Sequence, residues 1–201
     1  MVHQQGARRR WTLIDLGSHV LDIALHLLDE PRVTSVSAVA YGEIGRSGRG
    51  GRPHGVAATG THAFEVEDFS SALLRLDNGR SLQLDASWAS YSQVYEDIEV
   101  ELLGSAGGAR LHVADYATEG TITLYSEVAG APTTSRPDVK VPAGHHRSVI
   151  AEFLAAIASG ADAPAGGPRY SGHYGEYALH RSRVVDAIYR SAAEKKEVEV
   201  A

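Results

Sequence analysis

Cysteine is absent from this chain of 201 residues, and lysine occurs only at Lys140, Lys195 and Lys196. Without cysteine the protein has neither disulfides nor thiolate ligands for a metal. Its net charge of -6 is the opposite of the basic surface that nucleic acids and anionic membranes attract. No apolar run reaches the roughly 18 residues of a membrane-spanning helix, and the N-terminus lacks the apolar core of a signal peptide. We therefore expect a cytoplasmic protein with no nucleic-acid or membrane partner.

Nucleotide-binding motifs are also missing. No Gly-x-Gly-x-x-Gly follows a strand and opens a helix, and no Gly-x-x-x-x-Gly-Lys-Ser/Thr occurs. The glycine-rich segment 104–108 lies between two expected strands, which predicts a turn rather than a phosphate-binding loop. The sequence therefore indicates no cofactor-binding residues in this chain.

Residues 11–28 are the most informative segment. Asp15, His19, Asp22 and His26 recur at spacings of four, three and four, which places them on one stripe of a helix. Nearly all other positions are apolar, so we expect the helix to be buried on most sides. Four ligands spread along about 16 Å of one straight helix cannot converge on a single ion, so no metal site is predicted. A metal-dependent hydrolase or isomerase is only a distant alternative.

Alternating apolar residues and turn signals predict strands in the middle of the chain. Asn78-Gly79 predicts a hairpin, because these residues readily take positive φ angles. The expected strands are 34–41, 70–76, 81–87, 96–103, 109–113, 121–125, 138–141 and 198–200, and the later helices are 145–158 and 174–193. This order predicts an α+β fold with an open, predominantly antiparallel β-sheet, helices packed on one face and the other face available for oligomerisation.

Segment 43–60 fits no compact element. It is rich in glycine and carries Arg46, Arg49, Arg52 and His54. One interpretation is a surface insertion. The other is an arm that brings guanidinium groups to an anionic substrate or a partner subunit. The sequence leaves both interpretations open.

Five segments, taken in order, resemble the C-terminal domain of the Gfo/Idh/MocA oxidoreductases, the glucose-fructose oxidoreductase and inositol dehydrogenase family. They lie at 13–22, 64–69, 82–88, 100–111 and 186–192. The resemblance implies a residual linker or N-terminal extension at 1–10 and a substrate-binding and oligomerisation domain at 11–201. It also implies a two-domain NAD(P)-dependent enzyme, of which this chain supplies the second half.

Two parts of the family pattern have no match in this sequence. One is the Rossmann domain, and the other is the catalytic lysine of a Glu-Lys-Pro motif, since all three lysines occur in other contexts. The intact family enzyme uses NAD or NADP, and we expect neither to bind this chain alone. Whether the chain is an enzyme by itself is left open.

The family's Asp-x-x-x-His motif falls on Asp15 and His19, which the resemblance marks as catalytic. Oxidation of a secondary alcohol needs a base for the hydroxyl proton, and imidazole ordinarily titrates near neutral pH. Asp15 would accept a hydrogen bond from the substrate or orient the imidazole. Trp88, at the end of a strand, is a candidate substrate-binding residue, and a core or interface tryptophan is the alternative. Asp22 and His26 are expected to pack or cap.

Two functions are therefore carried forward. The favoured one is the substrate-binding and catalytic half of an NAD(P)-dependent oxidoreductase for a sugar, polyol or related secondary alcohol, inactive without its nucleotide-binding domain. The alternative is a non-catalytic sugar-binding or scaffold protein derived from that domain. Expected partners are the sugar or polyol, further copies of the chain bound through the sheet face, and possibly a separate Rossmann-domain chain. Tyr91, Tyr95 and Trp88 are the aromatic candidates near that face.

Overall fold

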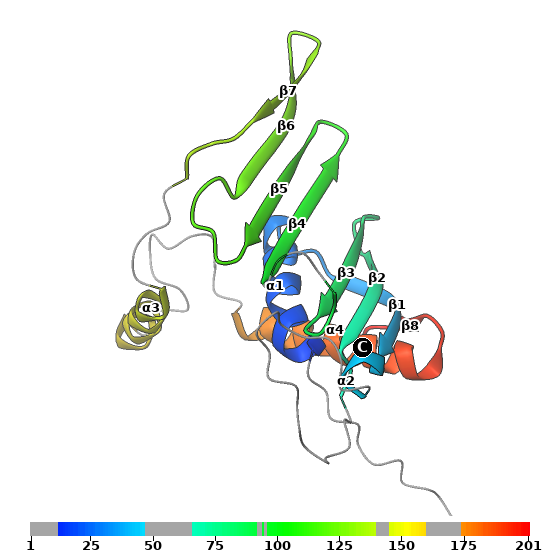
Figure 1. The fold of residues 1–201 in the computed structure, drawn as a ribbon. Coiled ribbons are helices and arrows are strands. Elements are labelled where there is room, and N and C mark those ends of the chain that lie inside the picture. The colour runs from blue at the N-terminus through cyan, green and yellow to red at the C-terminus, as the bar shows by residue number, and fades with distance from the viewer. Residues whose placement is uncertain (1–11, 47–65, 92–93, 95, 140–144, 160–173) are drawn as a thin grey trace, which may run out of the picture.

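Two four-stranded antiparallel sheets and the helices around them make up the fold (Figure 1). The computed structural model describes residues 12–46, 66–91, 94, 96–139, 145–159 and 174–201. In chain order the elements are η1 (Leu13–Gly17), α1 (Ser18–Leu27), β1 (Val33–Tyr41), α2 (Glu43–Arg46), β2 (Phe69–Leu76), β3 (Ser81–Ser87), β4 (Asp97–Gly104), β5 (Gly107–Ala114), β6 (Ile122–Val128), β7 (Ala131–Ser135), α3 (His145–Ser159), α4 (Tyr174–Glu194) and β8 (Val198–Glu199).

The predicted α+β class with open antiparallel strands is confirmed. The strands divide into one sheet with the order β3-β2-β1-β8 and another with the order β4-β5-β6-β7. Figure 1 shows the second sheet extending away from the first, with its β6–β7 hairpin at the far end. None of the helices in the described ranges is long and apolar enough to cross a lipid bilayer.

The hydrophobic core lies between the first sheet and the helices α1 and α4. Alternation along β2 turns Leu74 and Leu76 inward, and α4 covers them with Val184 and Ile188 at helical spacing. Burying such side chains contributes on the order of 1.5–3 kcal/mol each. The core comprises Leu13, Leu21, Leu25, Val33, Val36, Ala72, Leu74, Leu76, Leu84, Val184, Val185, Ala187, Ile188 and Val198.

The hairpin predicted at Asn78-Gly79 is confirmed between β2 and β3. Gly79 takes φ 80°, whereas Asn78 is not among the residues with positive φ. The Leu76 N–H donates to the carbonyl of Arg80 at 2.9 Å, which encloses a three-residue loop. The loop is a turn followed by a glycine in the left-handed conformation, so of the two positive φ angles expected at Asn78 and Gly79 only that of Gly79 occurs.

The β6–β7 hairpin was not predicted, and the strand expected at 138–141 is wrong for its described residues 138–139. Ala129 and Gly130 make the turn with φ 51° and φ 80°. A positive φ is unfavourable for alanine, so Ala-Gly is a weak turn signal. Pro132 follows in β7, the edge strand of its sheet, where a missing N–H is tolerated.

Helix α3 departs from the expectation that the helices pack on a sheet face. Its apolar residues Val149, Phe153 and Ile157 are all more than half exposed, and Figure 1 shows the helix standing apart from α1 and α4. Most of segment 43–60 lies outside the described residues, as does Tyr95; its first residues, Glu43–Arg46, form the short helix α2.

The first helix begins with the π-helical turn η1, in which the Ser18 N–H donates to the carbonyl of Leu13. Gly17 ends this turn and is buried against β3. A Cβ placed on Gly17 would lie 2.7 Å from Leu13 Cδ1 and 3.3 Å from Ala86 Cβ. Leu13 is itself only 1% exposed, so it has little room to move away.

Gly17→Ala should therefore lower the free energy of unfolding by about 1–3 kcal/mol through overpacking. Urea denaturation monitored by circular dichroism measures the change. Gly175→Ala in α4 is the matched control, because its added Cβ meets no atom within 4 Å. That variant should be neutral or slightly stabilising. Equal stability of the two variants would contradict the close packing of η1 on β3.

Candidate functional site

Asp15 and His19 lie on the exposed side of the first helix, Asp15 within η1 and His19 at the start of α1. The two side chains do not hydrogen-bond to each other, and no other described residue bonds to either of them. Turns of π-helix occur frequently at functional sites. The helix thus presents a carboxylate and an imidazole one turn apart, both open to a ligand.

The N-terminal end of this helix is held by Glu67, which comes from the loop before β2. One carboxylate oxygen of Glu67 accepts from the Leu13 N–H at 3.1 Å and from the Tyr189 hydroxyl at 2.6 Å. Its backbone carbonyl accepts from the Thr12 hydroxyl at 2.7 Å. A carboxylate also suits this end because the N–H groups of a helix N-terminus carry partial positive charge.

Trp88 follows directly after β3, as predicted, and belongs to the same cluster. Its indole N–H donates to the Glu67 carbonyl at 3.1 Å, and its side chain is 38% exposed. The neighbouring Asp68 is 2% exposed and accepts from the Gly45 N–H at 2.8 Å. Trp88 is therefore joined through Glu67 to the start of the helix that carries Asp15 and His19.

Asp22 and His26 take part in ion pairs with structural partners, whereas the sequence predicted that they pack or cap. Arg181 of α4 pairs with Asp22 and donates to both carboxylate oxygens of Glu30, at 3.0 and 2.8 Å. His26 Nδ1 lies 3.5 Å from Glu30. The Arg181 and Glu30 side chains are only 12% and 15% exposed, so their pair ties α4 to the end of α1 largely away from bulk water. Asp22 is 51% exposed.

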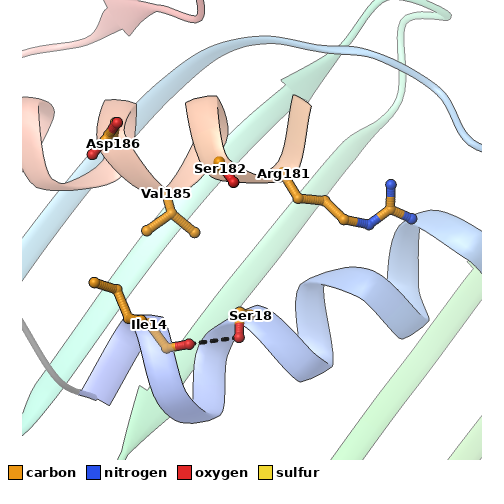
Figure 2. A pocket seen from close by; sticks show the side chains of 6 residues that line it. All are labelled: Ile14, Ser18, Arg181, Ser182, Val185 and Asp186. Atoms are coloured by element: carbon orange, nitrogen blue, oxygen red, sulfur yellow. Dashed lines mark hydrogen bonds between the residues drawn. The ribbon is translucent and has the colours of Figure 1, made fainter. Parts of the chain in front are cut away.

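A shallow pocket of about 270 Å³ lies between the first helix and α4. Figure 2 shows Ile14 and Ser18 on one side, facing Arg181, Ser182, Val185 and Asp186 of α4. The Ser18 hydroxyl donates to the Ile14 carbonyl at 2.6 Å. The lining residues of the first helix directly precede Asp15 and His19, so the pocket borders the candidate site. It contains neither of the two side chains.

His180 is a half-buried titratable group that was not predicted from the sequence. Its Nε2 accepts from the Val33 N–H at 2.9 Å, and its Nδ1 is buried. Burial lowers the pKa of His180, and the positive charges of Arg32, Arg181 and Arg183 lower it further. The neutral imidazole is therefore part of the structure, joining α4 to β1.

Sequence reasoning also missed Glu67 and Arg181. Glu67 stands inside the segment 64–69 that carried the family resemblance, but its partners come from both ends of the chain. Arg181 is one of three arginines on α4, and arginines on a helix ordinarily indicate a solvated face. Glu67 and Arg181 make these contacts because the first helix lies beside α4 in the fold.

Neither a metal-ligand cluster nor a glycine-rich phosphate-binding loop at 104–108 is found in the part of the chain that the structure describes. No three His, Asp or Glu side chains in the described ranges lie close enough to hold a metal. The glycine-rich segment 104–108 joins β4 to β5, as predicted, instead of opening a helix. A Cβ at Gly107 would lie 2.7 Å from the Tyr125 carbonyl, so this glycine serves the packing of the sheet.

Comparisons with known proteins show which family this chain is similar to. The family described as the GFO/IDH/MocA C-terminal domain matches residues 4–110, which is more than half of the chain. D-glucoside 3-dehydrogenase of Escherichia coli is 31% identical over 107 residues, which are 53% of this chain and 30% of that enzyme.

Solved structures agree with the fold over nearly the whole chain. Levoglucosan dehydrogenase in its apo form gives a TM-score of 0.68 at 20% identity, covering 93% of this chain and 50% of that one. Aldose-aldose oxidoreductase from Caulobacter crescentus, complexed with glycerol, gives 0.64 at 21%, covering 94% and 47%. Another structure of levoglucosan dehydrogenase contains NADH and L-sorbose. This chain thus spans about half the length of the similar solved proteins.

The lowered pKa of His180 predicts a loss of stability in mild acid. Below pH 6.5, the ordinary pKa of histidine, the imidazole of the unfolded chain binds a proton that the imidazole of the folded chain does not. Stability should therefore fall as pH drops below 6.5 and stop falling once the folded imidazole is also protonated. His180→Gln keeps an acceptor for the Val33 N–H and does not titrate. Thermal melts between pH 7.5 and 5 should show a smaller loss for this variant, and an equal loss would contradict the assignment.

Proposed function

This chain belongs to the GFO/IDH/MocA C-terminal domain family, and we propose that it is the substrate-binding and proton-transferring half of an NAD(P)-dependent oxidoreductase. Its substrate class is a sugar, polyol or related secondary alcohol. Relatives with that chemistry include the D-glucoside 3-dehydrogenase and levoglucosan dehydrogenase described above. The fold itself belongs to a family of sugar oxidoreductases, whereas the activity of this particular chain is the proposal.

The observation that supports the proposal is the contrast within one stripe of the first helix. Asp22 and His26 are engaged by Arg181 and Glu30. Asp15 and His19 are exposed and have no hydrogen-bond partner among the described residues. They are therefore the two members of the stripe that remain available to a substrate, and they are also the two that match the family's Asp-x-x-x-His motif.

In the proposed reaction the hydroxyl of the substrate lies against His19. The imidazole accepts the hydroxyl proton as the carbon becomes a carbonyl carbon, and Asp15 accepts a hydrogen bond from the substrate or stabilises the imidazolium that forms. Acceptance of hydride is the chemistry that a nicotinamide supplies when it is bound. We expect a nucleotide-binding domain, in the same protein or in a partner chain, to hold that cofactor.

His19→Ala and Asp15→Asn should each lower turnover by about 100-fold or more, the size expected for loss of a general base or its partner. The protein to assay is the native one that joins this chain to its nucleotide-binding domain, or the complex that does so. Absorbance of the reduced nicotinamide reports turnover with a panel of sugars and polyols. Unchanged turnover in both variants would show that the catalytic assignment is wrong.

His146→Ala is the control, since His146 is exposed on α3 and belongs to neither helix of the site. Turnover should stay at the wild-type level in this variant. The isolated chain should show no NADH binding by fluorescence titration, and stoichiometric binding would contradict the assignment of the cofactor to another domain. An intact protein that binds sugars without any turnover would support the alternative of a sugar-binding or scaffold protein.

We also propose that copies of the chain associate through the outer face of the first sheet. Val39, Tyr41 and Leu73 are 43%, 51% and 39% exposed there, and the Tyr41 ring stacks on Phe69 with centroids 6.2 Å apart. Exposed apolar and aromatic side chains on a sheet face support self-association. Leu73→Glu should shift the mass measured by sedimentation toward that of a single chain. A wild-type protein that is already monomeric would overturn this proposal.

A further inference from the structure

We propose that Glu67 is a positioning residue for the candidate site, setting the places of Asp15, His19 and Trp88 together. The inference rests on the proposed function, because it concerns how that site is built. Within the described parts of the chain, no residue hydrogen-bonds to the side chains of Asp15 and His19. Their positions are therefore set by the backbone of η1 and α1.

Glu67 holds the N-terminal end of that backbone from a distant part of the sequence. Its carboxylate accepts a hydrogen bond from the Leu13 N–H at 3.1 Å, and its backbone carbonyl accepts one from the Thr12 hydroxyl at 2.7 Å. Thr12 and Leu13 are 0% and 1% exposed, so water cannot readily replace these contacts. Thr12 makes no side-chain cap to its own helix, which leaves Glu67 as the capping group.

Glu67 also contacts Trp88, the candidate substrate-binding residue. The indole N–H of Trp88 donates to the Glu67 carbonyl at 3.1 Å. The Tyr189 hydroxyl of α4 donates at 2.6 Å to the carboxylate oxygen that caps Leu13. One residue thus joins the helix of Asp15 and His19, the aromatic side chain after β3, and α4. Displacement of Glu67 would move the acid, the base and the aromatic ring relative to one another.

The backbone that follows Glu67 is held by hydrogen bonds to three other elements. Asp68 is 2% exposed, its N–H donates to the Tyr41 carbonyl at 2.8 Å, and its carboxylate accepts from the Gly45 N–H at 2.8 Å. The Asp68 carbonyl accepts from the Ser87 hydroxyl at 2.9 Å. Through Asp68, the backbone next to Glu67 is therefore hydrogen-bonded to β1, α2 and β3.

The test compares Glu67→Ala, Glu67→Gln and Tyr189→Phe in the full chain. Nuclear magnetic resonance of the His19 imidazole and the Trp88 indole N–H reports the two positions separately. Glu67→Ala removes the carboxylate that accepts from the Leu13 N–H and keeps the backbone carbonyl that accepts from Trp88, so it should shift the His19 signals strongly and the Trp88 signal less. Glu67→Gln, which keeps a side-chain oxygen acceptor, should return both close to the wild-type values. Tyr189→Phe removes only one hydroxyl and should give a smaller shift in the same direction. Its intact ring keeps the core filled, so it remains informative if Glu67→Ala does not fold.

Glu197→Ala is the matched control. This glutamate also accepts two hydrogen bonds, from the Ser35 hydroxyl at 2.5 Å and Arg75 Nε at 3.1 Å, and has no contact with η1. It should leave the His19 and Trp88 signals unchanged. If Glu67→Ala leaves them unchanged as well, or if Glu197→Ala shifts them equally, the positioning role is overturned.

In the complete oxidoreductase, Glu67→Ala should lower kcat by about 100-fold, the loss expected when a reacting group is misplaced by about 1 Å. Glu67→Gln should restore most of it. Loss of turnover in His19→Ala together with normal kcat in Glu67→Ala would overturn the positioning role and leave the proposed function intact. Normal turnover in His19→Ala would instead overturn the proposed function, and the resonance shifts would then decide the role of Glu67 independently.

Discussion

The contact between α4 and β1 is the constraint on which the rest of the structure depends. It joins the two ends of the chain, because β1 follows the first helix and α4 precedes the last strand. Val184 and Ile188 fill the core above Val36, and all three are at most 1% exposed. Among the described residues β8 pairs with Ser35 and Val36, and side chains of α4 extend the anchoring of β1 beyond that short strand.

Side chains of α4 satisfy backbone N–H groups that β8 does not reach. The Val33 N–H donates to His180 at 2.9 Å, and the Ala38 N–H donates to the Ser191 hydroxyl at 2.9 Å. Ser191 is fully buried, and its hydroxyl donates a hydrogen bond to the Lys196 carbonyl at 2.6 Å. A buried N–H left without an acceptor costs about 1–3 kcal/mol, so these contacts fix the register of α4 on β1 as well as its attachment. With that register fixed, Arg181 and Tyr189 reach the two ends of the first helix.

The parts of the fold that could be predicted are those governed by local rules. Alternation gave β2 and β3, and Gly79 marked their hairpin, because each signal lies within a few residues. The turn at Ala129 was missed because alanine rarely takes the positive φ that it has here. For the site, the spacing of Asp15 and His19 predicted their shared helix, whereas the anchors Glu67 and Arg181 depend on contacts between residues far apart in the sequence.

The polar side chains around the first helix divide into those that the fold needs and those that it does not. Arg181 and Glu67 bridge separate elements, so the fold itself needs them. Asp15 and His19 are exposed and have no described partner. Surface side chains without such contacts usually change stability by no more than about 0.5 kcal/mol. Packing therefore does not require a carboxylate and an imidazole at these positions. The first helix is anchored by Glu67 at its start and by Arg181 near its end, and Asp15 and His19 lie between these anchors. This arrangement favours ligand recognition over a purely structural role for the two side chains.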